Sequence, residues 1–110
     1  MNNVRREKIK REEYRIFNVI KTQQFDKATL KQIRNNISDI LDEESWAFDN
    51  YPENLQNSSR GEAMQDAIDC LSTSIECIES IIDELNIQDN EDIIDILEEA
   101  CDELMDARLV

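Results

Sequence analysis

Apolar residues recur at intervals of three and four along most of the chain, the spacing that places side chains on one face of an α-helix. This pattern predicts a first helix over about residues 3–24 and a second over about residues 26–48. In the second helix an apolar stripe is interrupted at Glu44, and Asp26 can cap its first turn. The first helix begins with a polar third, which we expect to fray. Its apolar positions are Ile9, Ile16, Phe17, Val19 and Ile20.

The pattern breaks at about residues 49–59, where Pro52 and several Asn and Ser residues favour a turn. Ser59 and Glu62 have the spacing of a capping box, so we expect a third helix over about residues 60–86. Its Ile and Leu residues fall at heptad positions a and d, as in a coiled coil. A parallel stripe of mostly small residues, including Cys70 and Cys77, gives this helix a second packed side.

A fourth helix is predicted from about residue 90 to about Ala107, with Asp89 or Asn90 as its cap. The short connection before it makes residues 60–107 a long antiparallel hairpin. The sequence therefore predicts an all-α fold: a bundle of about four helices with coiled-coil-like seams, in one domain over residues 1–110. These seams are extensive enough to leave a homodimer open.

Charge divides the chain into two unlike parts. The 110 residues carry a formal net charge of −14 and include no His. Residues 1–36 hold ten basic and four acidic side chains, a net charge of +6. Residues 37–110 hold two basic and 22 acidic side chains, a net charge of −20. This asymmetry indicates either that the two parts pair with each other or that they have different partners.

Residue types that the sequence lacks exclude several kinds of catalytic and metal site. Without His, the usual Ser-His-Asp and Cys-His nucleophile systems and the imidazole metal sites are excluded. The acidic segment from Asp89 to Ile93 has no Gly and does not fit an EF-hand loop. The three cysteines are odd in number and form no CxxC pair, so we interpret them as packed thiols. We expect no enzymatic activity, no metal site and no cofactor.

No apolar run approaches the roughly 18 residues that a membrane span requires. A signal-like apolar segment at the N-terminus is also missing. We therefore expect a soluble cytoplasmic protein without membrane contact.

The acidic stretch from residue 62 to residue 106 is the most informative candidate site, because it contains 16 carboxylates and no cation. Folded as two antiparallel helices, it would span roughly 34 Å, with about one negative charge per 2 Å. Duplex DNA carries one per roughly 1.7 Å, so this face could imitate DNA to a protein with a basic groove. A solvated face that serves only solubility is the alternative. The predicted partner-binding acids are Glu62, Asp66, Asp69, Glu76, Glu79, Asp83, Asp95, Glu99 and Asp102.

Three aromatic residues, Trp46, Phe48 and Tyr51, crowd at the end of the second helix. They fit two interpretations: core anchors where the helix meets the turn, or partner-binding anchors at an exposed end.

The basic N-terminal helix offers a different interaction, since Arg5, Arg6, Lys8, Lys10 and Arg11 could each neutralise a phosphate. The net charge of −20 on the remaining residues would repel the same nucleic acid. We therefore expect this helix to lie against acidic helices of its own chain or of a second subunit, and do not expect direct nucleic-acid binding.

The segment from Asp49 to Met64 has the pattern D-N-x-P-E-N-L-Q-x-S-x-R-G-E-x-M. This pattern, with the acidic helical region after it, resembles a family of small acidic helical proteins of bacteriophages and prophages of Gram-positive bacteria. The resemblance covers about residues 40–85. It implies a phage or mobile-element origin and expression in the cytoplasm of a bacterial host, and it supplies no catalytic residues.

Small acidic phage proteins are often inhibitors that occupy the nucleic-acid grooves of host nucleases, and this is an analogy of class. The resulting expectation is a non-enzymatic accessory protein that binds a host defence or DNA-processing enzyme, as a DNA-mimic-like inhibitor of anti-CRISPR or anti-restriction type. The alternative is a small structural or nucleic-acid-associated phage protein that binds through its basic N-terminal helix.

Overall fold

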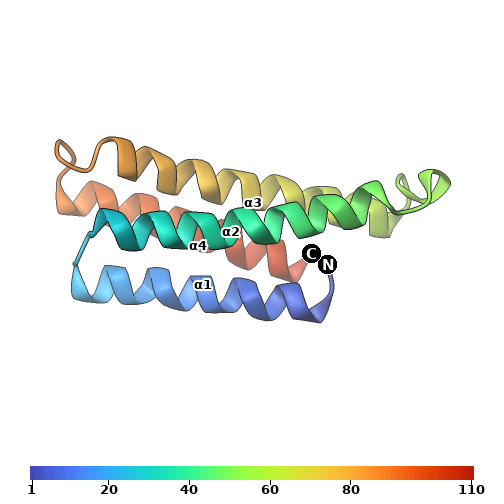
Figure 1. Cartoon of the computed structure of the whole chain (residues 1–110), viewed down its shortest axis with the longest axis horizontal. Helices are drawn as coiled ribbons and strands as arrows, with labels where there is room; N and C mark the ends of the chain where they lie inside the picture. The colour runs from blue at the N-terminus through green and yellow to red at the C-terminus, as the bar shows by residue number, and fades with distance from the viewer.

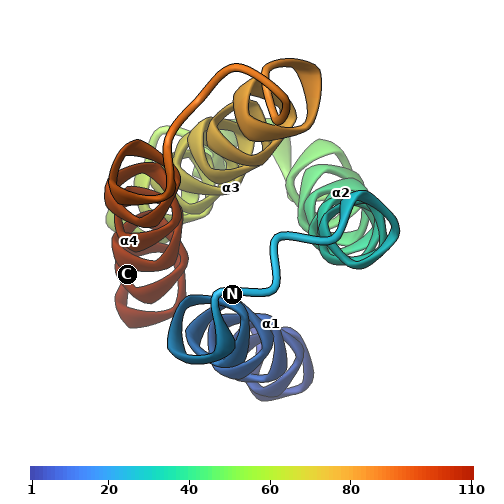
Figure 2. The same cartoon turned by 90° about the vertical axis from the view of Figure 1, so that its left-hand side faces the viewer.

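Four long α-helices form most of the chain in the computed structural model, which describes all 110 residues (Figure 1). They run alternately up and down, and viewed from one end they occupy four corners, with α1 next to α2 and α4 (Figure 2). The all-α bundle and the α3–α4 hairpin that the apolar spacing predicts are thus confirmed. The elements are α1 (Asn3–Thr22), α2 (Lys27–Asp49), the short 3-10 helix η1 (Glu53–Leu55), α3 (Ser59–Asp83) and α4 (Asn90–Leu109).

Side-chain caps fix the starts of the helices. Asp26 and Asp89 cap α2 and α4 as predicted, each accepting a hydrogen bond from a backbone N–H of the first turn. The cap expected at Ser59 is wrong by one residue. Ser58 has the extended backbone of an N-cap, and its Oγ accepts a hydrogen bond of 3.3 Å from the Gly61 N–H, whereas Ser59 is already helical.

The core consists of isoleucine and leucine side chains from all four helices. On α3 the heptad d positions Leu71 and Ile78 are fully buried, while the a positions Ile68 and Ile75 are half-buried beside them. Ser74, on the stripe of small residues, is also buried, and its Oγ donates a hydrogen bond of 3.0 Å to the carbonyl oxygen of Ala100 on α4. The stripe of small residues is therefore a second packed side of α3, as predicted, and it faces α4.

Two features of α1 differ from its sequence pattern. Phe17 is not a core residue: its side chain is 56% exposed, because the buried face of α1 runs through Ile9, Ile16 and Val19. The polar first third, expected to fray, is continuous helix from Asn3, with Asn2 as its N-cap. Ion pairs described below hold it against the bundle.

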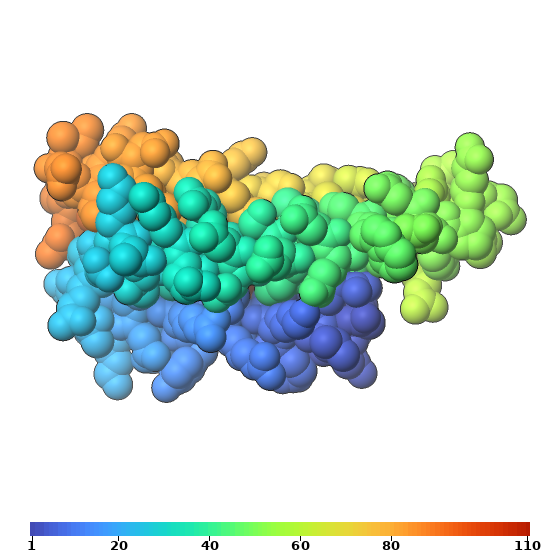
Figure 3. Space-filling view, in the orientation of Figure 1, coloured from blue at the N-terminus to red at the C-terminus, as the bar shows by residue number.

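The α2–α3 hairpin extends past the ends of α1 and α4 and forms a protruding tip, made of the end of α2, η1 and the start of α3 (Figures 1 and 3). The molecule is accordingly elongated, with extents of 47 × 22 × 19 Å. No helix has both the length and the apolar character needed to cross a membrane.

Candidate functional site

Ion pairs in this protein are concentrated around α1. All six involve α1 or the amino group of Met1, and none involves an acid of α3. Lys8 Nζ lies 2.7 Å from a Glu43 carboxylate oxygen on α2, and Arg108 Nε on α4 lies 2.6 Å from Glu13. The basic helix therefore pairs with acids of its own chain, one of the two arrangements expected from the charge asymmetry.

Glu44, the residue that interrupts the apolar stripe of α2, is fully buried. Arg5 Nε donates a hydrogen bond of 2.9 Å to its Oε1, and the Met1 amino group lies 3.7 Å from Oε2. A buried carboxylate needs such partners, because moving an unpaired charge from water into the protein interior costs several kcal/mol. The interrupted apolar stripe indicates that Glu44 is unusual, but nothing in the sequence indicates that Arg5 is its partner.

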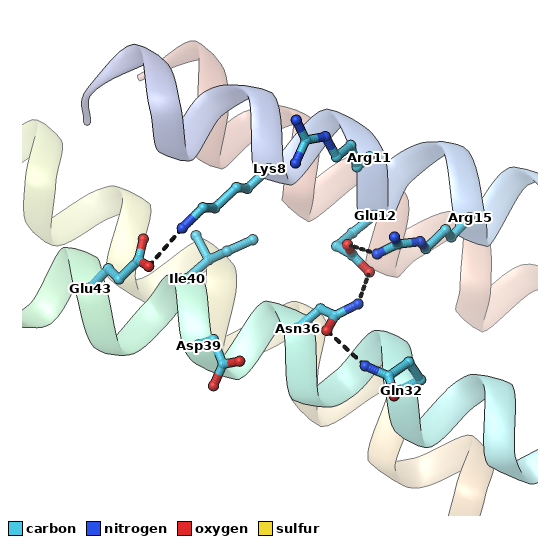
Figure 4. Close-up of a pocket in the computed structure, with 9 residues that line it drawn as sticks. All are labelled: Lys8, Arg11, Glu12, Arg15, Gln32, Asn36, Asp39, Ile40 and Glu43. Carbon is cyan, nitrogen blue, oxygen red and sulfur yellow. Dashed lines mark hydrogen bonds and ion pairs between the residues drawn. The ribbon is translucent and has the colours of Figure 1, made fainter.

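A groove of about 530 Å³ lies between α1 and α2 (Figure 4). Glu12 of α1 is buried at its floor and accepts hydrogen bonds from Asn36 of α2, at 3.1 Å, and from Arg15. Burial raises the pKa of the Glu12 carboxyl, and these hydrogen bonds offset part of the shift. The groove is lined by Lys8, Arg11 and Arg15 on one helix and mainly by acids and amides on the other, so it does not select for a charged ligand.

The nine predicted partner-binding acids are all exposed. On α3, Glu62, Asp69, Glu76 and Asp83 recur every seven residues, which places them in one outward-facing row. None of these four carboxylates has an ion-pair partner, and on α4 the only paired charge is that of Arg108. We call the outward-facing carboxylates of residues 62–106 the acidic surface.

The cysteines show that the acidic surface continues across the seam between α3 and α4. Burial raises the pKa of the Cys70 thiol to about 11, and Glu103 and Asp106 of α4 add to the shift. Burial and then Glu99 raise the pKa of Cys77 in the same way. Glu103 and Asp106 were missed at the sequence level, although they continue the helical spacing from Glu99. The raised thiol pKa values agree with packed, unreactive cysteines.

The aromatic cluster lies on the protruding tip. Trp46 is 70% exposed and therefore is not a core anchor, while Phe48 and Tyr51 are half-buried. The Gln56 side chain holds the turn by donating hydrogen bonds of 3.1 Å to the Phe48 carbonyl oxygen and 3.2 Å to the Tyr51 carbonyl oxygen. The tip therefore presents Trp46 and Phe48 from the end of α2, and Tyr51 from the turn that Gln56 holds.

Most of the basic residues considered for nucleic-acid contacts have partners within the chain. Arg5 and Lys8 bind acids of α2, and Lys10 pairs with Glu7. Arg6 donates hydrogen bonds to the Arg108 and Val110 carbonyl oxygens at the end of α4. Arg11 alone among the five makes no hydrogen bond or ion pair through its side chain.

No three Cys, Asp or Glu side chains come close enough together to hold a metal ion. No family model, curated protein or solved structure matches the chain.

Proposed function

We propose that this protein works by binding, and that its acidic surface occupies the basic nucleic-acid groove of a partner protein as a DNA duplex would. One observation carries the proposal. The carboxylates of α3 have no ion-pair partners, whereas every ion pair of the chain involves α1 or the N-terminal amino group. The acidic surface is thus left uncompensated while cations of the same chain are used elsewhere.

An uncompensated acidic row costs stability. Like charges three and four residues apart on a helix repel by about 0.2–0.5 kcal/mol per pair, and Glu76, Glu79 and Asp83 are spaced in this way. Binding to a cationic groove would relieve the repulsion. Electrostatic complementarity of this kind also speeds the encounter of the two proteins and makes it depend on salt.

The tip adds an apolar contribution at one end of the acidic surface. Trp46 is exposed, and the turn beside it is held by the Gln56 side chain. Because a backbone that is already ordered, in α2 or in the held turn, loses little conformational freedom on binding, Trp46, with Phe48 and Tyr51, suits the role of partner anchor.

For the partner, we favour a DNA-processing or defence enzyme of a bacterial host, which would make the protein an inhibitor encoded by a phage or mobile element. A non-enzymatic role follows from the same proposal. The resemblance of residues 40–85 to small acidic phage proteins supports this choice, and the finer assignment to anti-CRISPR or anti-restriction inhibitors rests on analogy of class.

Direct nucleic-acid binding through α1 is the second candidate, and the intrachain partners of Arg5, Arg6, Lys8 and Lys10 count against it. A deletion of residues 1–15 would remove core residue Ile9, so the test uses the whole chain. A mobility shift of a short DNA duplex or of RNA that disappears in the Lys10→Glu/Arg11→Glu variant would favour this candidate.

Affinity capture from a bacterial lysate tests the leading proposal. Wild type is compared with the α3 reversal variant, Asp69→Lys/Glu76→Lys/Asp83→Lys. A control variant, Glu7→Lys/Asp39→Lys/Asp42→Lys, makes the same change in net charge at exposed acids of α1 and α2. The proposal is supported if wild type and the control capture a protein that the α3 reversal variant does not capture. A DNA duplex should also displace that protein. Equal capture by all three, or no displacement by DNA, would reject it.

A further inference from the structure

The outer face shared by α1 and α4 exposes apolar side chains that the proposed function does not use. Tyr14 is 65% exposed and Phe17 is 56% exposed on α1, and Met105 and Leu109 are exposed on α4. Exposed aromatic and aliphatic side chains that gather on one face mark an interaction surface more often than scattered ones do.

Contacts between the two helices place these residues on the same face. Glu13 of α1 faces α4, because it pairs with Arg108 and its carbonyl oxygen lies 3.9 Å from Cys101 Sγ. Phe17 is one turn after Glu13, and Met105 lies between Cys101 and Arg108 in sequence. The two helices therefore present adjacent outward rows. The rows are Lys10, Tyr14, Phe17 and Lys21 on α1, and Glu98, Asp102, Met105 and Leu109 on α4.

The two rows carry opposite charges. On α1, Lys10 and Lys21 flank the aromatic pair. The acids beside them are Glu7, 3.3 Å from Lys10, and Glu13, which is paired with Arg108. On α4, Glu98 and Asp102 stand beside the apolar positions and have no cationic partner. Each row is thus complementary to the other in charge, and both contribute apolar surface.

We propose that this face binds a second copy of the chain, with the α1 row of each copy on the α4 row of the other. A two-fold axis parallel to the helices produces this arrangement, since it exchanges the positions of α1 and α4 across the interface. The pairing of Glu13 with Arg108 fixes the relative heights of α1 and α4 along the bundle. An axis parallel to the helices keeps these heights, so Tyr14 and Phe17 lie opposite the Glu98–Met105 stretch of the second copy. An axis perpendicular to the helices would instead oppose α1 to α1 and bring lysines together.

The available area fits a modest dimer. Each helix of this face has 20 residues and is about 30 Å long, and the bundle is 22 × 19 Å across. The face can bury about 600 Å² per copy, or about 1,200 Å² in total, the lower end for specific interfaces. We expect a dissociation constant in the micromolar range. The dimer face covers Glu98 and Asp102 of the acidic surface. The α3 row and the tip lie outside it, so the dimer would display two α3 rows, and its existence does not depend on the proposed function.

Sedimentation equilibrium of the wild-type chain and of Phe17→Ser measures the dimer directly. Because Phe17 is exposed, its replacement should leave the helical circular dichroism unchanged and weaken dimerisation at least tenfold. Ile87→Ser, at an 82% exposed position between α3 and α4, is the matched control and should leave the dissociation constant unchanged. Wild-type protein that remains monomeric at about 0.5 mM would overturn the proposal.

A charge exchange tests the arrangement of the helices. Lys10→Glu/Lys21→Glu and Glu98→Lys/Asp102→Lys should each abolish the homodimer, because each opposes like charges at both contacts. Mixed in equal amounts, the two variants should form a heterodimer, since both of its α1–α4 contacts are again complementary. A mixture that stays monomeric, or single variants that dimerise like wild type, would overturn the pairing of α1 with α4.

Discussion

Arg5 and Glu44, 39 positions apart in the sequence, meet at the point where the start of α1 packs on α2. The Nε of Arg5 donates a hydrogen bond of 2.9 Å to Oε1 of Glu44, whose side chain is fully buried. This contact ties the polar first turn of α1 to the base of the protruding tip. It accounts for a continuous helix where the sequence suggested fraying.

Replacing Arg5 by Ala should destabilise the fold strongly, because it removes the guanidinium partner of a buried carboxylate. We expect a loss of about 3 kcal/mol in the free energy of unfolding, measured by urea denaturation. Lys8→Ala is the matched control: its ion pair with Glu43 is partly exposed on both sides, so its loss should cost less than about 1 kcal/mol. Equal effects of the two substitutions would contradict the role assigned to Glu44.

Gly61→Ala should also destabilise the protein, against the usual effect of such a change in a helix. Alanine is normally favoured over glycine in a helix by about 1 kcal/mol. A Cβ at position 61, however, would lie 2.1 Å from the Gln56 carbonyl oxygen, so the turn of the tip would have to move. The expected cost is about 1–3 kcal/mol in urea unfolding. A variant more stable than wild type would show that the tip adapts freely.

The buried Glu12 carboxyl predicts a pH-dependent difference between wild type and Glu12→Gln. Its pKa is raised from the ordinary 4.5, mainly by burial, so the folded state binds its proton more tightly than the unfolded state does. Lowering the pH through the raised pKa therefore stabilises wild type relative to the variant. At neutral pH we expect Glu12→Gln to be the more stable protein, with the advantage lost below the ordinary pKa. Urea unfolding across this pH range measures the difference, and a constant difference would contradict it.

Repulsion on α3 predicts a dependence of thermal stability on salt. Glu79 has Glu76 three residues before it and Asp83 four residues after it, all exposed. The melting temperature should rise when salt is increased from about 0.05 M to about 0.5 M, because the acidic surface is then screened. Glu79→Lys should raise the melting temperature at low salt more than Glu79→Gln does. A melt independent of salt would mean that the cations of α1 already compensate the acids.

The parts of the fold that could be predicted from the sequence are those that depend on interactions between residues close together in the chain. Apolar spacing identified all four helices because the fully buried residues, such as Leu30, Leu71 and Leu97, follow the helical period. The caps at Asp26 and Asp89 were predictable because a cap acts within its own first turn. The cap of α3 was misplaced by one residue, since two serines stand together and only the turn before them determines which is extended.

Contacts between segments that are distant in the chain could not be predicted from the sequence. Glu44 looked like a defect in a stripe because Arg5, its partner, is supplied by another helix. Phe17 belongs to the apolar pattern of α1, yet the packing of α1 against α2 and α4 leaves it exposed. For the candidate site, helical spacing predicted rows of carboxylates, but only the packing of α4 on α3 brings Glu103 beside Cys70.

The salt dependence of the complex with a captured partner tests the central claim most directly. Titration of that partner with wild type and with the α3 reversal variant, between about 50 mM and about 200 mM salt, compares the two affinities. If the acidic surface occupies a basic groove, the affinity of wild type falls at least tenfold over this range, and the variant does not bind. An affinity that is unchanged by salt and retained by the variant would contradict the claim.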